Sequence, residues 1–167
     1  YRGESYASAD LRKYDMAQKD YAAVVNRGPS KFYSKASEKA ALLSLNSQNN
    51  PAQALEYARK WEESAPTDAS RFSAQITALE AAYKSGNNSV AVTEYANKVN
   101  ASPLASADQY ALANFYLGKM AYDKGDFTRA YPALQSVAEN ANSEIMPEAY
   151  HLMAQIRPPV DKQLGIG

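Results

Sequence analysis

The sequence predicts an all-α protein assembled from repeated helix pairs, and three observations support this prediction. The chain of 167 residues is rich in alanine and holds thirteen tyrosines, while β-branched residues are few in most segments. Small residues let helices approach closely, and aromatic rings fill the space that remains between them. The second observation is a repeated spacing of alanine and proline. The third is a pair of turn-forming residues that recurs with the same spacing.

The repeat is visible in alanines that recur at nearly constant distances. Ala17, Ala54 and Ala91 are each 37 residues apart and are each followed by a proline twelve residues later, and Ala130 comes 39 residues after Ala91. Turn-forming pairs lie four or five residues before the last three alanines: Asn49-Asn50, Gly86-Asn87 and Gly125-Asp126. A period of about 40 residues, in which no single helix can bury its apolar face, indicates stacked helix-turn-helix repeats.

The first three repeats are expected at about residues 1–29, 30–66 and 67–103, each with two helices joined by a turn. The first repeat, whose turn is expected to be about two residues longer, is marked by Gly3, Tyr6, Tyr14, Ala17 and Tyr21. The second is marked by Ala41, Leu42, Leu45, Ala54, Ala58 and Trp61. The third is marked by Leu79, Tyr83, Ala91, Tyr95 and Val99.

The fourth repeat, about residues 104–142, shows the pattern most clearly. Its first helix is expected over Ala111 to Lys124 and is ended by Gly125, and Asp126 is expected to cap its second helix. Gly118 and Ala130 are expected to be small because the two helices cross there.

A partial fifth repeat, residues 143–157, is expected to begin a first helix at Pro147 and to end at Arg157-Pro158-Pro159. Residues 158–167 are expected to be extended or disordered. Residues 1–157 then form a single repeat domain of about nine helices, with both ends continuing a longer array.

The fourth repeat resembles the tetratricopeptide repeat (TPR), whose pattern is matched by Leu117-Gly118, Tyr122, Gly125-Asp126-Phe127 and Ala130. It departs from the pattern at Asn114, Leu134 and Asn142, and at Pro132, which is expected to kink the second helix or to delay its start. The resemblance implies a right-handed superhelical α-solenoid of antiparallel helix pairs.

The resemblance also implies a concave groove, lined by the first helices, that binds an extended peptide or a partner helix. The matching positions are Lys39, Leu43, Asn46, Ile76, Glu80, Tyr83, Phe115, Lys119, Tyr122, His151 and Gln155. Tyr83 and Tyr122 are the expected anchors, although both rings could instead pack against a neighbouring helix. The family's carboxylate clamp is disfavoured, because its asparagine positions hold Ala40, Thr77 and Tyr116.

Composition argues against several other classes of function. Eighteen basic and eighteen acidic residues give a formal net charge of zero, and the short basic clusters lack stacking aromatics, so no nucleic-acid partner is expected. No apolar run approaches the length of a membrane span, so no direct membrane insertion is expected. Cysteine is absent and His151 is the single histidine, so no catalytic, cofactor or metal site is expected.

The sequence therefore favours a non-catalytic module that binds a protein or peptide partner and scaffolds an assembly. One alternative is a structural spacer, or an oligomerisation segment that contacts a second copy through exposed terminal repeats. Another is an accessory domain of an enzyme whose catalytic part lies outside this chain. The segment from residues 116–156 is similar to repeats of bacterial cell-envelope proteins, which favours a periplasmic or cell-envelope location over the cytoplasm.

Overall fold

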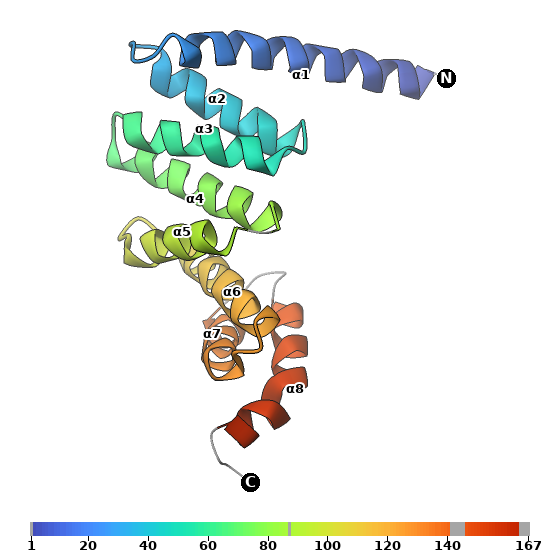
Figure 1. Ribbon diagram of the computed structural model, residues 1–167, viewed down its shortest axis with the longest axis vertical. Coiled ribbons are helices and arrows are strands. Elements are labelled where there is room, and N and C mark those ends of the chain that lie inside the picture. Colours follow the sequence, from blue (N-terminus) through green and yellow to red (C-terminus); the bar gives the residue numbers. More distant parts are fainter. Residues whose placement is uncertain (1, 87, 141–145, 164–167) are drawn as a thin grey trace. The chain divides into compact units, whose positions relative to one another are not determined.

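The computed structural model describes residues 2–86, 88–140 and 146–163, and its regular elements are eight α-helices (Figure 1). These residues form no strand, which confirms the predicted all-α class. The helices group into two compact units, Tyr1–Asn88 and Ser89–Gly167, called here the N-terminal and C-terminal units. The boundary between them falls between the two helices of the third predicted repeat.

The N-terminal unit holds four helices in which each helix packs on the next, and α4 also contacts α2. They are α1 (Arg2–Asn26), α2 (Tyr33–Asn46), α3 (Pro51–Ser64) and α4 (Asp68–Lys84). This order brings the first helices of successive repeats together, as expected for an array of helix pairs.

The C-terminal unit also stacks its helices in chain order. They are α5 (Ser89–Ala101), α6 (Ala107–Asp123), α7 (Phe127–Asn140) and α8 (Met146–Gln163). Consecutive packing within both units confirms a solenoid-like arrangement.

Local signals in the sequence explain where several helices begin. The side chain of Asn50 accepts a hydrogen bond from the Gln53 amide, 3.2 Å away, at the start of α3. Ser106 and Gln109 form a reciprocal capping box at the start of α6. Each cap satisfies amide groups that have no partner within the helix.

At three of the turns that the sequence predicts, one residue adopts the left-handed backbone conformation. Asn49 has φ 48°, Gly86 has φ 86° and Gly125 has φ 75°. Asp126 follows Gly125 and accepts a hydrogen bond from the Arg129 amide at 3.4 Å, so it caps α7 as predicted. Glycine adopts positive φ without the steric cost that other residues carry, and asparagine is the next most tolerant.

The core is built around helix crossings at small residues. An added Cβ at Gly118 would lie 3.0 Å from Cγ of Leu134 and 3.2 Å from Cβ of Ala133. Leu134 and Ala130 are both fully buried. These contacts confirm that Gly118 is small because α6 crosses α7 there, and Ala130 lies in the same core.

A buried tryptophan joins the second and third repeats within the N-terminal unit. Trp61 on α3 is 3% exposed, and its Nε1 donates a hydrogen bond of 2.9 Å to Oγ of Ser70 on α4. The indole therefore adds a polar link to the apolar contact between these helices.

The first repeat differs from its prediction because it forms one helix, α1, instead of two helices and a turn. The aligned turn position holds Arg12-Lys13, where the other repeats place asparagine or glycine. Arginine and lysine favour helix and resist positive φ, so nothing local interrupts the backbone. The described residues therefore hold eight helices and not about nine.

The proline-containing helices also differ from prediction. Helix α7 starts at Phe127 and runs through Pro132, so the expected delay in its start is wrong. Helix α8 continues past Pro158-Pro159 to Gln163 and bends along its length (Figure 1), so residues 158–163 are not extended. Proline fixes φ near the helical value, and its missing amide bends a helix without always ending it. Residues 164–167 of the predicted tail lie outside the described residues.

Replacing Gly118 by valine is expected to lower the free energy of unfolding by about 1–3 kcal/mol, because the new methyl groups would overlap with Leu134. The loss should shrink in the presence of Leu134→Ala, which leaves room for them. Urea unfolding of both single variants and the double variant measures this coupling.

Gly125→Ala is the matched control, since an added Cβ at Gly125 meets no atom within 4 Å. Its positive φ alone should cost about 1–2 kcal/mol, and this cost should add to that of Leu134→Ala. If the effects of Gly118→Val and Leu134→Ala on the free energy of unfolding also added in the double variant, the proposed contact between Gly118 and Leu134 would be wrong.

Candidate functional site

The eleven residues predicted to line a groove fall into two groups, one in each unit. Helices α2 and α4 of the N-terminal unit carry Lys39, Leu43, Asn46, Ile76, Glu80 and Tyr83. Helices α6 and α8 of the C-terminal unit carry Phe115, Lys119, Tyr122, His151 and Gln155. Each group comes from the first helices of two successive repeats.

In the N-terminal unit, the predicted residues range from exposed to half-buried. Lys39 and Asn46 are exposed, whereas Leu43, Ile76, Glu80 and Tyr83 are half-buried. The Glu80 carboxylate lies 2.9 Å from Nζ of Lys84 on the same helix. This group is therefore a mixed apolar and charged surface on two helices that contact each other.

In the C-terminal unit, four of the five predicted residues form two neighbouring sets of polar contacts on α6 and α8. Nζ of Lys119 lies 3.2 Å from Oε1 of Glu148, and the Tyr122 hydroxyl donates a hydrogen bond of 2.8 Å to Oε1 of Gln155. Nε2 of Gln155 lies 3.1 Å from Nε2 of His151. We call these five residues the α6–α8 surface.

Glu148 belongs to the α6–α8 surface but was not among the predicted residues. Its carboxylate pairs with Lys119 from α8 to α6, two helices between which only α7 intervenes in the sequence. Its place three residues before His151 on the same helix was the available signal, because residues three apart share a helix face. The side chains of Lys119 and Glu148 remain 31% and 50% exposed, so the pair is accessible to solvent.

Tyr122 is both part of this surface and packed against a neighbouring helix. Its ring is tilted against Phe127 of α7 with the centroids 5.9 Å apart, and the residue is half-buried. One side of the Tyr122 ring therefore packs within the protein, as the alternative interpretation of the sequence stated. Its hydroxyl remains in the α6–α8 surface.

Phe115 does not belong to the surface, because it is only 3% exposed. Its ring lies 6.1 Å from that of Tyr116, at an angle of 53°. A side chain in this position contributes to the core and has no area left for a partner.

The positions at which the TPR family places its carboxylate clamp are buried as well. Ala40 is fully buried, and Tyr116 and Thr77 are 8% and 7% exposed. The Thr77 hydroxyl donates to the Ser73 carbonyl on its own helix. These side chains serve the packing of α2, α4 and α6.

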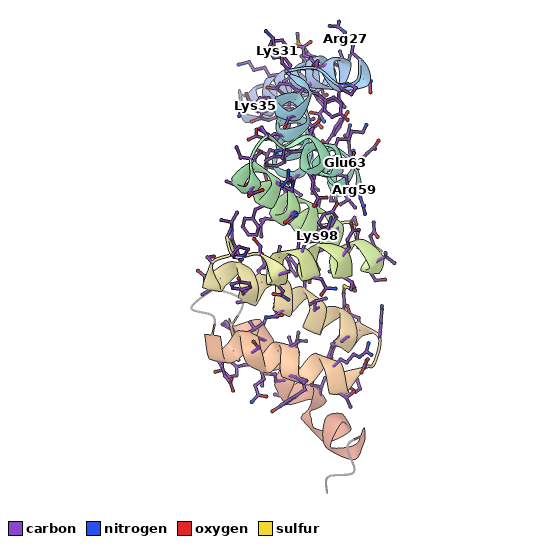
Figure 2. All side chains as sticks on the ribbon, turned by 90° about the vertical axis from the view of Figure 1, so that its left-hand side faces the viewer. Arg27, Lys31, Lys35, Arg59, Glu63 and Lys98 are labelled. Carbon is purple, nitrogen blue, oxygen red and sulfur yellow. The ribbon has the colours of Figure 1, made fainter. Side chains whose placement is uncertain are left out.

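A cluster of basic residues near the turn between α1 and α2 is a further surface feature (Figure 2). Nζ of Lys31 lies 4.9 Å from the ring centroid of Phe32, which is 59% exposed, and Nζ of Lys35 lies 3.1 Å from Glu38. Exposed pairs of this kind contribute little energy. The cluster is a weaker candidate than the α6–α8 surface, whose polar groups converge from two helices.

The α6–α8 surface is suited to hydrogen bonding with a polypeptide. It offers an ammonium, a carboxylate, a carboxamide, a phenol and an imidazole from adjacent helix faces, at distances that allow a partner to take over individual bonds.

The part of the chain that the structure describes contains no group of three or more histidine, cysteine, aspartate or glutamate residues arranged for a metal ion. Within that part, no helix is long and apolar enough to span a bilayer.

Substitutions should separate this surface from the core. Phe115→Ala is expected to lower the free energy of unfolding by about 3–5 kcal/mol, as for other buried aromatic side chains. His151→Ala is expected to change it by less than about 0.5 kcal/mol, because the imidazole is exposed. Urea unfolding of both variants provides the comparison, and a large loss for His151→Ala would show that these polar contacts are needed for folding.

In comparisons with known proteins, no protein-family model, no curated protein and no solved structure matches the chain. The TPR resemblance therefore depends on the spacing of residues within the chain. The assignment of the surface depends on its geometry.

Proposed function

We propose that this protein is a non-catalytic TPR-like module that binds a protein or peptide partner through the exposed faces of its first helices. The observation that carries the proposal is the α6–α8 surface, in which predicted groove residues from two successive repeats converge. Lys119 pairs with Glu148, and Tyr122, Gln155 and His151 form a second set of contacts at the protein surface.

The small stabilising energy of these exposed contacts favours their replacement by contacts with a partner. Hydrogen bonds and ion pairs at exposed positions contribute about 0–1 kcal/mol each to stability, so replacing them by bonds to a bound segment costs little. Tyr122 adds a rigid aromatic side chain whose position is already fixed by Phe127. A side chain that is ordered before binding loses less entropy when the partner arrives.

Self-association as a structural spacer is the second candidate, and helix α1 provides the observation that favours it. Leu11, Tyr14 and Met16 are 53%, 38% and 67% exposed. The face from Tyr150 to Ile156 supports self-association less well, because Leu152 and Ile156 are 8% and 1% exposed. Light scattering across a range of protein concentrations distinguishes a monomer from an oligomer formed through α1.

Partner capture from an extract of the source cell tests the proposed function. A variant with Lys119→Glu, Tyr122→Phe and Gln155→Ala is expected to recover at least about tenfold less of the specific partner than the parent protein, a loss of about 1.4 kcal/mol in binding. Tyr122→Phe keeps the ring contact with Phe127 and removes only the hydroxyl group.

The matched control carries Asn97→Asp on α5 and Gln135→Glu on α7, both at exposed positions, and it changes the net charge by −2, as the surface variant does. It should capture the partner as well as the parent does, and circular dichroism should show equal helicity for all three proteins. Equal recovery by the surface variant and the control would refute binding through the α6–α8 surface.

A further inference from the structure

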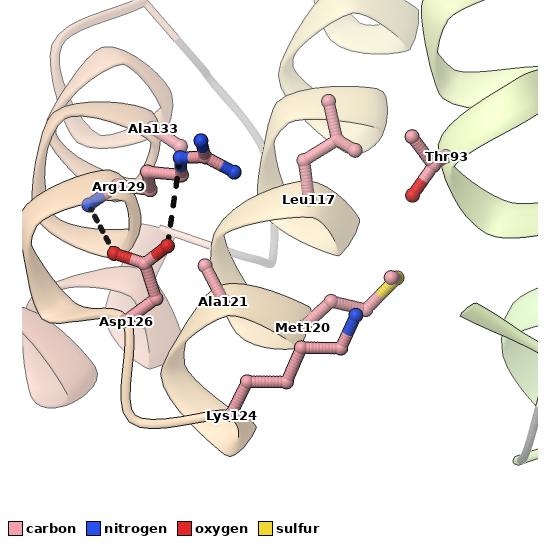
Figure 3. A pocket seen from close by; sticks show the side chains of 8 residues that line it. All are labelled: Thr93, Leu117, Met120, Ala121, Lys124, Asp126, Arg129 and Ala133. Atoms are coloured by element: carbon pink, nitrogen blue, oxygen red, sulfur yellow. Dashed lines mark hydrogen bonds and ion pairs between the residues drawn. The ribbon is translucent and has the colours of Figure 1, made fainter. Parts of the chain in front are cut away.

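A second surface of the C-terminal unit has the features of a binding cleft. The cleft has a volume of about 340 Å³ and lies between α5, α6 and α7 (Figure 3). Ligand pockets in proteins have volumes of about 300–1,000 Å³, so the cleft can accept one or two side chains of a partner. It was not anticipated from the sequence.

The floor of the cleft is apolar. Leu117, Met120 and Ala121 of α6 and Ala133 of α7 line it, and all four residues are half-buried. Apolar surface left in a concave site gains free energy when a partner covers it. The cleft therefore favours an apolar side chain as its occupant.

The rim of the cleft carries an excess of positive charge. Lys124 and Arg129 lie at the rim together with one carboxylate, that of Asp126. Nε of Arg129 lies 3.5 Å from Oδ2 of Asp126, and its side chain is 85% exposed. Lys124 forms no ion pair with any residue that the structure describes.

The Asp126 carboxylate carries one negative charge, so it cannot neutralise both cations. It also accepts hydrogen bonds at the start of α7. Its Oδ1 accepts hydrogen bonds from the Thr128 hydroxyl at 3.0 Å and from the Arg129 amide at 3.4 Å. Two cations thus face one carboxylate that is already engaged. An incoming carboxylate would meet net positive charge beside an apolar floor.

We propose that this cleft binds a partner protein segment in which an apolar side chain is flanked by aspartate or glutamate. The apolar side chain covers Leu117 and Met120, while the acidic groups meet Lys124 and Arg129. A nucleic acid fits less well, because no aromatic ring lines the cleft for base stacking.

This cleft is distinct from the α6–α8 surface. Met120 of the cleft precedes Tyr122 by two residues on α6, and two residues turn a helix by about 200°, so their side chains leave α6 on opposite sides. The two surfaces can therefore be altered separately. A variant of one leaves the test of the other intact.

Methyl NMR of the intact protein tests the proposal with a defined probe. The probe is a ten-residue peptide with two leucines flanked by four aspartates, titrated to millimolar concentration. Shifts are expected in the methyl groups of Leu117, Met120 and Ala133, with Leu43 and Ile76 unchanged. A peptide with serine in place of leucine, and one with lysine in place of aspartate, should each bind at least about tenfold more weakly.

The charge-reversed variant Lys124→Glu, Arg129→Glu is expected to weaken binding of the acidic peptide at least about tenfold. Arg27→Glu, Lys31→Glu, with the same change in net charge at exposed positions in the N-terminal unit, should leave the affinity unchanged. Circular dichroism verifies that both variants are folded.

Three results of the peptide titrations would overturn the proposal. They are no methyl shift with the acidic peptide, equal affinity for all three peptides, and equal affinity of the two protein variants. Shifts of the same methyl groups when the protein concentration is raised without peptide would identify a second copy of the chain as the occupant, and would also overturn it.

Discussion

The close approach of helices at alanine and glycine positions is the constraint on which the rest of the structure depends. Ala54, Ala91 and Ala130 are fully buried, and Gly118 has no room for a Cβ beside Leu134. Only side chains this small allow neighbouring helices to meet along their backbones. Helix α6 is placed by this contact, and both exposed surfaces of the C-terminal unit lie on α6.

Local chemistry explains how much of the fold could be predicted from the sequence. Asn49, Gly86 and Gly125 lie between α2 and α3, between α4 and α5, and between α6 and α7, where the sequence predicted turns. The errors fall where local signals were missing or ambiguous. Arg12-Lys13 provides no residue that favours positive φ, and Pro158 lowers the stability of a helix without dictating its end.

The candidate site was less predictable, because it depends on contacts between helices. The resemblance to the TPR pattern identified the face of α6 that carries Lys119 and Tyr122. It could not show that Phe115, on the same face, is buried. The pairing of Lys119 with Glu148 depends on the distance between α6 and α8, which no spacing within one helix determines.

The buried indole of Trp61 has a spectroscopic consequence. It is the single tryptophan of the sequence, and it lies in the N-terminal unit with its Nε1 bonded to Ser70. Its fluorescence reports on that unit alone, whereas far-ultraviolet circular dichroism reports on the helices of both units. Coincident denaturation curves would mean that the chain melts as one cooperative body, and separated curves would mean that it consists of two independent folding units.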